Sequence, residues 1–550
     1  LPTWYEIRVN RDGYTARTPD FDLVVAMNPA TYARDIAEVR SGGWLLHDSS
    51  WPLDEALLRD DVTFVGVPLG RMCIEAFEGN RQRTLMKNVA CAGALAALLD
   101  IDLAVIGDAI RDEFAKKPKA VDANLRALHL GFDHARAHFA CPLPIRLEAM
   151  DATRGHVLLD GNTAAALGCV YAGATVGAWY PITPATSLMD AFIRFCARYR
   201  VDAETGERRY CIVQAEDELA AAGVVIGAGW AGARAFTPTA GPGISLMGEF
   251  IGLAYYTEIP AVFFDVQRTG PSTGMPTRTQ QGDLLAIAYA SHGDTKHVAL
   301  FPCDPAECFH FAVQAFDLAE RFQTPVFVVS DLDIGMNDWM VPRLAWDDAY
   351  RPDRGEVLTA EQLAAMQRFS RYLDVDGDGV AARSLPGVHP RGAYFTRGSG
   401  HDAHAAYTED ADAYTEVIDR LTRKLETAAR AVPPPEIRLR EGAEAGIVAL
   451  GGCHRAVLEA VDRLAAEGTL LDYMRIRGFP FDAPVADFLR RHERVFVVEQ
   501  NRDGQLRSLL QLETGIAGDR LASIRDYGGV PLSARRVMEG VHALTVEVAA

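Results

Sequence analysis

Apolar segments alternate with loops of small and polar residues through the middle of the chain, most clearly between Gly161 and Asp283. Three apolar segments in that region each run into a loop rich in Gly, Pro, Thr and Ser. Strands that alternate with helical patterns predict a parallel α/β sheet. Ligands of such sheets bind beyond the carboxyl ends of the strands, so these loops predict a site at that edge.

The same reading extends along the whole chain. Runs of apolar residues predict strands at 21–29, 62–68, 211–218, 261–266, 325–333, 446–452 and 492–501. Helical spacing predicts helices at 88–100, within 114–139 after Pro118, and at 415–431. The resulting class is a multidomain α/β fold.

Breaks in the pattern suggest four regions. A chain of 550 residues is too long for one core. We expect a first α/β domain at 1–145, a second at 155–340, a polar, Gly- and Arg-rich connection at 341–430, and a last α/β domain at 440–550. The linker AVPPPEI precedes the last domain, because three consecutive prolines cannot continue a helix.

Composition excludes several classes of protein. The net charge of −19 argues against nucleic-acid binding, which needs a basic face. There is no run of 18 apolar residues and no secretory signal pattern, so we expect neither a membrane span nor export. The nine cysteines contain no CxxC pair, which is typical of reduced thiols in the cytoplasm and offers no iron–sulfur cluster in this chain.

Several long motifs carry a resemblance to a known family. The chain resembles the α subunit of 2-oxoacid:ferredoxin oxidoreductases, most closely the 2-oxoglutarate members, with a γ-type domain fused before it. That first domain lacks the Gly-rich start of the family's version, so it is expected either to be N-terminally incomplete or to be a degenerate form of that domain. The motifs are YPITP (180–184), EDELAA (216–221), GPGISLMGE (241–249), VQRTGPSTGMPTRTQQGDL (266–284), TPVFVVSDLDIGMNDW (324–339) and YFTRGSGHDAHAAYTED (394–410).

The resemblance implies a reaction and its partners. Oxidative decarboxylation of 2-oxoglutarate with coenzyme A as co-substrate would yield succinyl-CoA and CO₂, reversibly, with ferredoxin taking the electrons. Thiamine diphosphate would be shared with a β subunit that holds Mg²⁺ and a [4Fe–4S] cluster, in a dimer of αβ heterodimers. The alternatives are pyruvate, branched-chain or aryl 2-oxoacids as substrates, or a non-catalytic assembly subunit.

The resemblance also implies which residues meet the cofactor. The region 155–340 would be a transketolase-like pyrimidine-binding domain, and 440–550 would resemble the transketolase C-terminal domain. Glu218 is the first candidate for the carboxylate that binds the aminopyrimidine, and Glu216 the second, because the alignment can slide by two residues. Pro181 and Ile182 would also contact the cofactor. The plain alternative is that both acids simply favour the start of a helix.

A second set of residues is expected to bind substrate. Thr183 lies between two prolines that fix its loop, and Arg268 offers a fork of donors suited to a carboxylate. A turn residue and an interdomain salt bridge are their respective alternatives. The resemblance assigns both to the 2-oxoacid, adds Thr273 as a nearby contact, and suggests Arg278 and Asp402 as weaker candidates.

Three patterns suggest a metal or phosphate site, and each lacks a required residue. Gly377-Asp378-Gly379 matches the start of the thiamine diphosphate motif, but no Asn pair follows. Asp374, Asp376 and Asp378 match the first half of an EF-hand loop, where Leu385 replaces the required Glu. His401 and His404 have no third ligand at a suitable spacing. We therefore expect no metal site in this chain.

Overall fold

The computed structural model describes residues 3–549, with side chains described through residue 545. The chain divides into two compact units. One unit contains the start of the chain through Arg8 and then Thr18–Arg154; the other contains Val9–Arg17 and everything from Gly155 onward. No helix among the described residues is long and apolar enough to cross a membrane.

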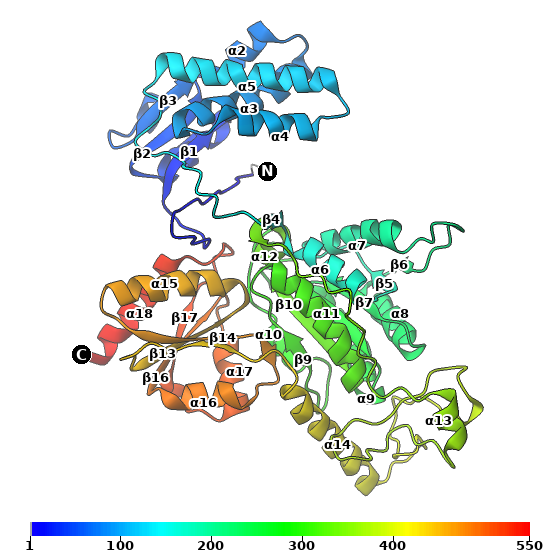
Figure 1. The fold of residues 1–550 in the computed structure, drawn as a ribbon. Helices are drawn as coiled ribbons and strands as arrows, with labels where there is room; N and C mark the ends of the chain where they lie inside the picture. Colours follow the sequence, from blue (N-terminus) through cyan, green and yellow to red (C-terminus); the bar gives the residue numbers. More distant parts are fainter. Residues whose placement is uncertain (1–2, 550) are drawn as a thin grey trace. The chain divides into compact units, whose positions relative to one another are not determined.

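The first unit is built on three parallel strands in the order β1-β2-β3. Helices α3 and α5 lie side by side (Figure 1), and their alanines form much of this unit's core. The pattern analysis missed β2 because its first half is polar and Gly-rich, and only its second half is apolar. The elements are β1 (Phe21–Ala26), α1 (Tyr32–Glu38), β2 (Val39–Asp48), β3 (Thr63–Val67), α2 (Leu69–Ala76), α3 (Asn80–Leu99), α4 (Leu103–Glu113) and α5 (Pro118–His138).

A 7-stranded sheet in the second unit carries the expected site, in the order β15-β9-β10-β8-β7-β5-β6. Its neighbouring strands are parallel except for β15 against β9. The strands are β5 (Val176–Trp179), β6 (Cys211–Gln214), β7 (Ala235–Thr239), β8 (Ala261–Gln267), β9 (Val298–Leu300), β10 (Pro325–Asp331) and β15 (Gly478–Phe479).

Helices cover both faces of this sheet, as a buried parallel sheet requires. One face packs against α6 (Gly161–Tyr171), α7 (Thr186–Tyr199) and α11 (Pro305–Phe322). The other packs against α8 (Glu218–Trp230), α9 (Gly241–Thr257) and α10 (Leu284–Ala288). After β10 come α12 (Leu332–Met336) and β11 (Trp339–Pro342), which pairs with β4 (His156–Leu159).

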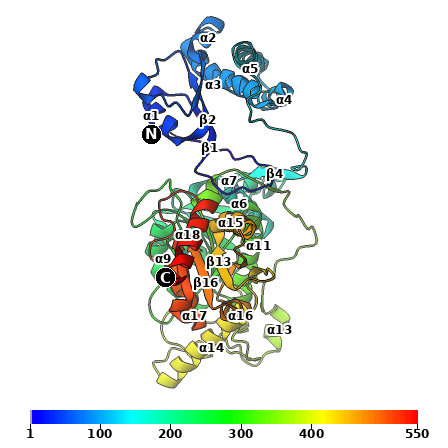
Figure 2. The same cartoon turned by 90° about the vertical axis from the view of Figure 1, so that its left-hand side faces the viewer.

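A second sheet follows, in the order β12-β14-β13-β16-β17, parallel except for β12. Helices α15 and α18 lie side by side on one face, and α16 and α17 cover the other (Figures 1 and 2). The elements are β12 (Glu436–Arg438), β13 (Ala445–Leu450), α15 (His454–Ala466), β14 (Leu471–Ile476), α16 (Ala483–Arg491), β16 (Arg494–Glu499), α17 (Gln505–Thr514), β17 (Leu521–Arg525) and α18 (Ala534–Ala549).

The connection between the two sheets contains α13 (Ala360–Ala365) and α14 (Ala411–Ala429). Buried ion pairs attach it to the first sheet. Glu320 of α11 binds Arg234 at 2.7 Å and Arg383 of the connection at 2.9 Å. This region is therefore an ordered part of the second unit, where the sequence pattern indicated mainly polar loops.

One expected element is wrong in a way that affects the site. The strand expected at 211–218 ends at Gln214, and Glu218 instead opens α8. The reason is the side chain of Asp217, whose Oδ1 accepts a 2.7 Å hydrogen bond from the Ala220 backbone N–H and so caps the helix. The acids thus lie in the loop and first helical turn after the strand.

Candidate functional site

Four neighbouring parallel strands, β6, β5, β7 and β8, end at the same edge of the sheet. Thr183 lies in the loop after β5, Glu216 and Glu218 follow β6, and Arg268 follows β8. Sheet order therefore brings these loops to one edge, because parallel strands share the direction in which they end.

Helix α6 fixes the loop after β5 by hydrogen bonds. The buried Asn162 donates its side-chain N–H groups to the Pro184 carbonyl at 2.9 Å and to the Ser187 hydroxyl at 2.8 Å. Pro181 and Thr183 remain exposed, and Ile182 is half-buried. The loop consequently presents Thr183 at the edge on a fixed backbone.

Arg268 reaches this loop from β8. Its Nη1 donates a 2.7 Å hydrogen bond to the Thr183 carbonyl oxygen, and the side chain is only 8% exposed. Its Nε has no hydrogen-bond partner among the described residues. The guanidinium is thus aimed at the Thr183 loop with donor capacity left for a ligand.

The two candidate acids differ sharply in environment. Glu216 is exposed, whereas Glu218 is 6% exposed in the first turn of α8. A methyl group on Gly243 would lie 2.9 Å from Glu218 Cγ, so a larger residue there would displace this side chain. Within the described part of the chain, the Glu218 carboxylate has no hydrogen bond or ion pair. Although most of this side chain is buried, its carboxylate oxygens reach the surface and are therefore accessible to a ligand.

Two further acids, Asp265 and Asp283, lie near this edge of the sheet. The sequence analysis did not identify either of them. Asp265 of β8 is fully buried, and neither of its carboxylate oxygens has a partner among the described residues. Burial raises its pKa well above the usual range, and Asp283 raises it further. Burial also raises the pKa of Asp283 to about 6, against the opposing charge of Arg268. A charged residue inside the otherwise apolar strand AVFFDVQ was the signal available in the sequence.

The loop from 268 to 283 also contacts the second sheet. The Gln281 side chain donates to the Leu450 carbonyl at 3.0 Å, and its backbone N–H donates to the Gln500 carbonyl at 2.9 Å. Thr273 and Arg278 of the same loop are exposed. The loop therefore has a fixed base on both sheets and an exposed tip.

Comparisons with known proteins give the chain its family. Residues 167–356 match the pyruvate flavodoxin/ferredoxin oxidoreductase thiamine diphosphate-binding domain, and residues 1–134 match the pyruvate ferredoxin/flavodoxin oxidoreductase family. The 2-oxoglutarate oxidoreductase subunit KorA of Mycobacterium tuberculosis is 30% identical over 89% of this chain and 76% of its own length. The chain belongs to the 2-oxoacid:ferredoxin oxidoreductase α-subunit family.

Other relatives agree with this assignment. Subunit alpha of 2-oxoacid:ferredoxin oxidoreductase 2 from Aeropyrum pernix is 33% identical over 81% of this chain and 70% of its own length. The solved 2-oxoglutarate:ferredoxin oxidoreductase from Magnetococcus marinus, which has 2-oxoglutarate, coenzyme A and succinyl-CoA bound, superposes with a TM-score of 0.86 at 27% identity, covering 96% of this chain and 88% of that one. The expected family, multidomain α/β fold, thiamine diphosphate dependence and oxidoreductase class are confirmed, and the name "subunit alpha" implies a partner subunit.

The family resemblance also suggested Asp402, which lies elsewhere in this chain. The neighbouring His401 ring packs 4.8 Å from Tyr256, in the last turn of α9, whereas the first turn of that helix adjoins the site. A helix of 17 residues is about 25 Å long. Asp402 itself accepts backbone hydrogen bonds from His404 and Ala406. Asp402 is therefore not brought together with Thr183 and Arg268.

The acidic turn that mimics an EF-hand is partly assembled. One carboxylate oxygen from each of Asp374, Asp376 and Asp378 lies within 4.8 Å of the others. Asp374 also accepts hydrogen bonds from the Gly377 and Gly379 backbone N–H groups and lies 3.5 Å from Arg423. The carboxylate of Asp374, which would be the first ligand of such a loop, is thus already bound by backbone N–H groups and faces an arginine.

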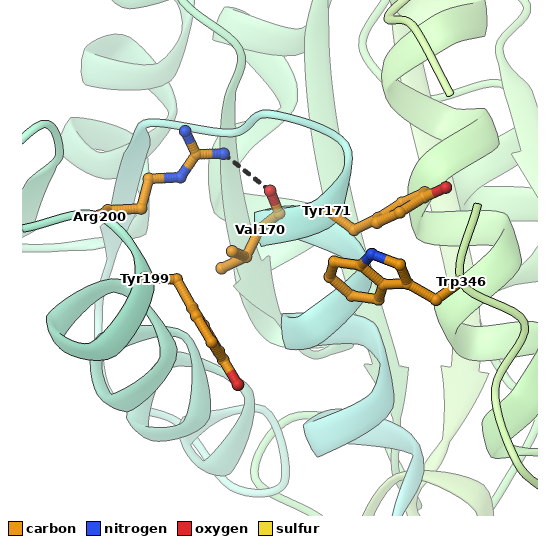
Figure 3. A pocket seen from close by; sticks show the side chains of 5 residues that line it. All are labelled: Val170, Tyr171, Tyr199, Arg200 and Trp346. Carbon is orange, nitrogen blue, oxygen red and sulfur yellow. Dashed lines mark hydrogen bonds between the residues drawn. The ribbon is translucent and has the colours of Figure 1, made fainter. Parts of the chain in front are cut away.

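One cavity in the second unit lies away from the candidate residues. It measures about 420 Å³ and is lined by Val170, Tyr171, Tyr199, Arg200 and Trp346 (Figure 3). Tyr171 ends α6 and Tyr199 ends α7, so the cavity lies near the amino end of β5. The candidate residues of this α subunit follow the opposite, carboxyl ends of the strands.

Proposed function

We propose that this chain is the α subunit of a 2-oxoglutarate:ferredoxin oxidoreductase. The enzyme would convert 2-oxoglutarate and coenzyme A reversibly to succinyl-CoA and CO₂, with ferredoxin as electron carrier. The observation that carries the proposal is the largely buried Glu218 side chain, whose carboxylate is accessible and has no partner within the described chain, at the edge where Arg268 is fixed against the Thr183 loop. Relatives named for 2-oxoglutarate support the substrate.

The residues of this chain suit the pyrimidine half of thiamine diphosphate. When bound, this cofactor supplies the nucleophile and the electron sink for decarboxylation. Glu218 would accept a hydrogen bond from the aminopyrimidine nitrogen at its accessible carboxylate. Glu216 is the weaker candidate because it is exposed. Pro181 and Ile182 would contact the ring from the loop after β5.

A β subunit would complete the enzyme. We assign to it the diphosphate–Mg²⁺ site and the [4Fe–4S] cluster, because the sequence has neither an Asn pair after Gly377-Asp378-Gly379 nor a CxxC pair. The expected assembly is a dimer of αβ heterodimers working in the cytoplasm, where the nine free cysteines would stay reduced.

Substrate would bind through carboxylate recognition. Arg268 would hold the 2-oxoacid carboxylate with the donors that the Thr183 carbonyl leaves free. Thr183 and Thr273 would lie near the keto group, and Arg278 on the exposed loop tip would meet a second carboxylate. Asp402 is the weakest of the substrate candidates, because the neighbouring His401 packs at the far end of α9 in this chain.

The test is substrate preference in the complex of both subunits. We expect kcat/KM for 2-oxoglutarate to exceed that for pyruvate and 2-oxoisovalerate by at least about tenfold, or 1.4 kcal/mol of differential binding. Arg268→Met should lower kcat/KM for all three acids, whereas Arg278→Met should lower it for the diacid alone. Equal rates with pyruvate would overturn the substrate assignment, and no rate with any 2-oxoacid would overturn the catalytic proposal.

A further inference from the structure

The second sheet has a crevice of the kind in which parallel α/β proteins bind ligands. Strands β13 and β16 are neighbours in this sheet, but helix α15 after β13 packs on one face and helix α17 after β16 packs on the other. Helices that leave on opposite faces open a crevice beyond the carboxyl ends of the two strands. The loop after β13 begins with Gly451 and Gly452, and the φ of Gly451 is +52°, a conformation that favours glycine. The proposed reaction does not use this crevice.

The side chain of Gln281, which is only 1% exposed, lies in this crevice. Its Nε2 donates a 3.0 Å hydrogen bond to the carbonyl oxygen of Leu450, the last residue of β13. Its Oε1 accepts hydrogen bonds from the Gln500 backbone N–H at 3.1 Å and from the Cys453 thiol at 3.3 Å. A methyl group on Gly451 would stand 3.1 Å from Gln281 Nε2, so the glycine leaves room for the amide. A residue of the loop after β8 thus occupies the ligand position of the second sheet.

The backbone on either side of this amide is bound to the same sheet. The Gln281 N–H donates to the Gln500 carbonyl at 2.9 Å, and the Gln281 carbonyl accepts from Asn501 Nδ2 at 3.0 Å. Gln505, the first residue of α17, donates from Nε2 to the Gly282 carbonyl at 2.6 Å. Side chain and backbone together make the crevice a specific receptor for this one segment, because each buried polar group has a defined partner.

The anchored segment is continuous with the candidate substrate residues. Arg268 begins the loop, and the exposed Arg278 stands three residues before Gln281. Two hydrogen bonds close the neck of the loop. The Thr269 N–H donates to the Arg278 carbonyl at 2.9 Å, and the Thr269 hydroxyl donates to the Thr279 carbonyl at 3.1 Å. Because this short stretch is held at the neck and at the crevice, a movement of Gln281 displaces Arg278.

We propose that Gln281 is a positioning residue, which anchors the loop from 268 to 283 in the crevice of the second sheet and thereby fixes Arg278. Its amide is bound to the second sheet, so it acts through the loop and not on the substrate. Arg268 has a separate attachment at the Thr183 carbonyl and depends less on this anchor. Recognition of a second carboxylate therefore depends on the last domain. This inference rests on the proposed roles of Arg268 and Arg278 in substrate binding.

The first test is the kinetics of Gln281→Met in the complex of both subunits, since Met keeps the length of the side chain and removes the amide. KM for 2-oxoglutarate should rise about tenfold with kcat within about twofold, whereas kcat/KM for pyruvate should change less than about threefold. Gly451→Ala crowds the same amide from the last domain and should act in the same way. The double variant should be no worse than Gln281→Met alone. Gln314→Met, an exposed position on α11, is the matched control and should behave as wild type.

A second readout does not depend on activity. Trypsin cuts after Arg278 when the loop opens locally, so cleavage there, followed by mass spectrometry below the unfolding temperature, reports the anchor. Gln281→Met and Gly451→Ala should be cut about tenfold faster than wild type and Gln314→Met. Cleavage of both variants at the wild-type rate, or an equal loss of kcat for 2-oxoglutarate and pyruvate, would overturn the proposal. Faster cleavage of the variants, with a wild-type complex that turns over no 2-oxoacid, would overturn only the proposed function.

Discussion

The two ends of helix α9 hold buried carboxylates in opposite circumstances. At the C-terminal end, Glu258 is fully enclosed and accepts hydrogen bonds from Arg420 at 3.0 Å and Lys424 at 2.8 Å. At the N-terminal end, Glu218 and Asp283 lie against glycines of the first turn and have no ion pair within the described chain. A paired buried charge holds the connection to the sheet, whereas an unpaired one is available to a ligand.

The difference is also electrostatic. Burial alone would raise the pKa of Glu258, but Lys424 and Arg420 hold it below its usual range. Burial raises the pKa of Asp283 to about 6 because Arg268 compensates only in part. Carboxylates of one helix neighbourhood are thus neutralised by cations at one end and only partly compensated at the other.

Removing the charge of Glu258, at the C-terminal end of α9, should have the largest effect on stability. Glu258→Gln leaves Arg420 and Lys424 buried without their anion, so we expect the free energy of unfolding to fall by about 3–5 kcal/mol. Urea unfolding of the full chain measures this loss. Glu539→Gln removes an exposed partner of Arg536 and should change stability by less than about 0.5 kcal/mol. A similar small change for Glu258→Gln would contradict the structural role of the pair.

A second buried acid, Glu307, is paired with arginines and should make the stability of the protein depend on pH. Burial raises the pKa of Glu307, but Arg475 and Arg477 lower it from 4.5 to about 2. Because the folded pKa lies below the unfolded one, the stability is present above pH 4.5 and lost as the pH falls through 2. At about 1.36 kcal/mol per unit, the contribution is about 3 kcal/mol.

Glu307→Gln should therefore be less stable than wild type at pH 7, with the gap closing between pH 4.5 and 2. Urea midpoints at several pH values measure it. A gap that stays constant with pH would show that Glu307 acts by packing rather than by charge.

The residues near the N-terminal end of α9 could be predicted from the sequence better than the ion pairs at its C-terminal end. Strands β6 and β8 follow from apolar runs, and Arg268 could be chosen because a loop follows β8. Strand β5 was not among the expected strands, and Thr183 was chosen from its place between two prolines and from the family resemblance. The pairing of Glu258 could not be predicted, because Arg420 and Lys424 lie more than 160 residues away on a helix whose packing depends on the whole connection. Asp265 was overlooked because an apolar strand was read as core, although its one acid was the exception.

Substitution of Glu218, beside the N-terminal end of α9, should change activity rather than stability. Glu218→Gln keeps the shape of the side chain but removes the carboxylate, so turnover of the complete complex should fall at least about 100-fold, or about 2.7 kcal/mol. Unfolding should be unchanged or slightly more difficult, since a neutral amide is easier to bury. Glu216→Gln should stay within about threefold of wild type because Glu216 is exposed. The reverse ranking would move the cofactor contact to Glu216.

The smallest effect is expected at the acidic turn of Asp374, Asp376 and Asp378. The side chain of Leu385 stands at the twelfth position of the loop, where calcium requires a bidentate Glu, and it packs against Gly232 instead. Millimolar Ca²⁺ should therefore raise the free energy of unfolding by less than about 0.5 kcal/mol, and Asp376→Asn should change it equally little. Urea unfolding with Ca²⁺ and with a chelator measures both. A stabilisation that grows with Ca²⁺ concentration and disappears in Asp376→Asn would mean that these acids bind the ion without the missing Glu.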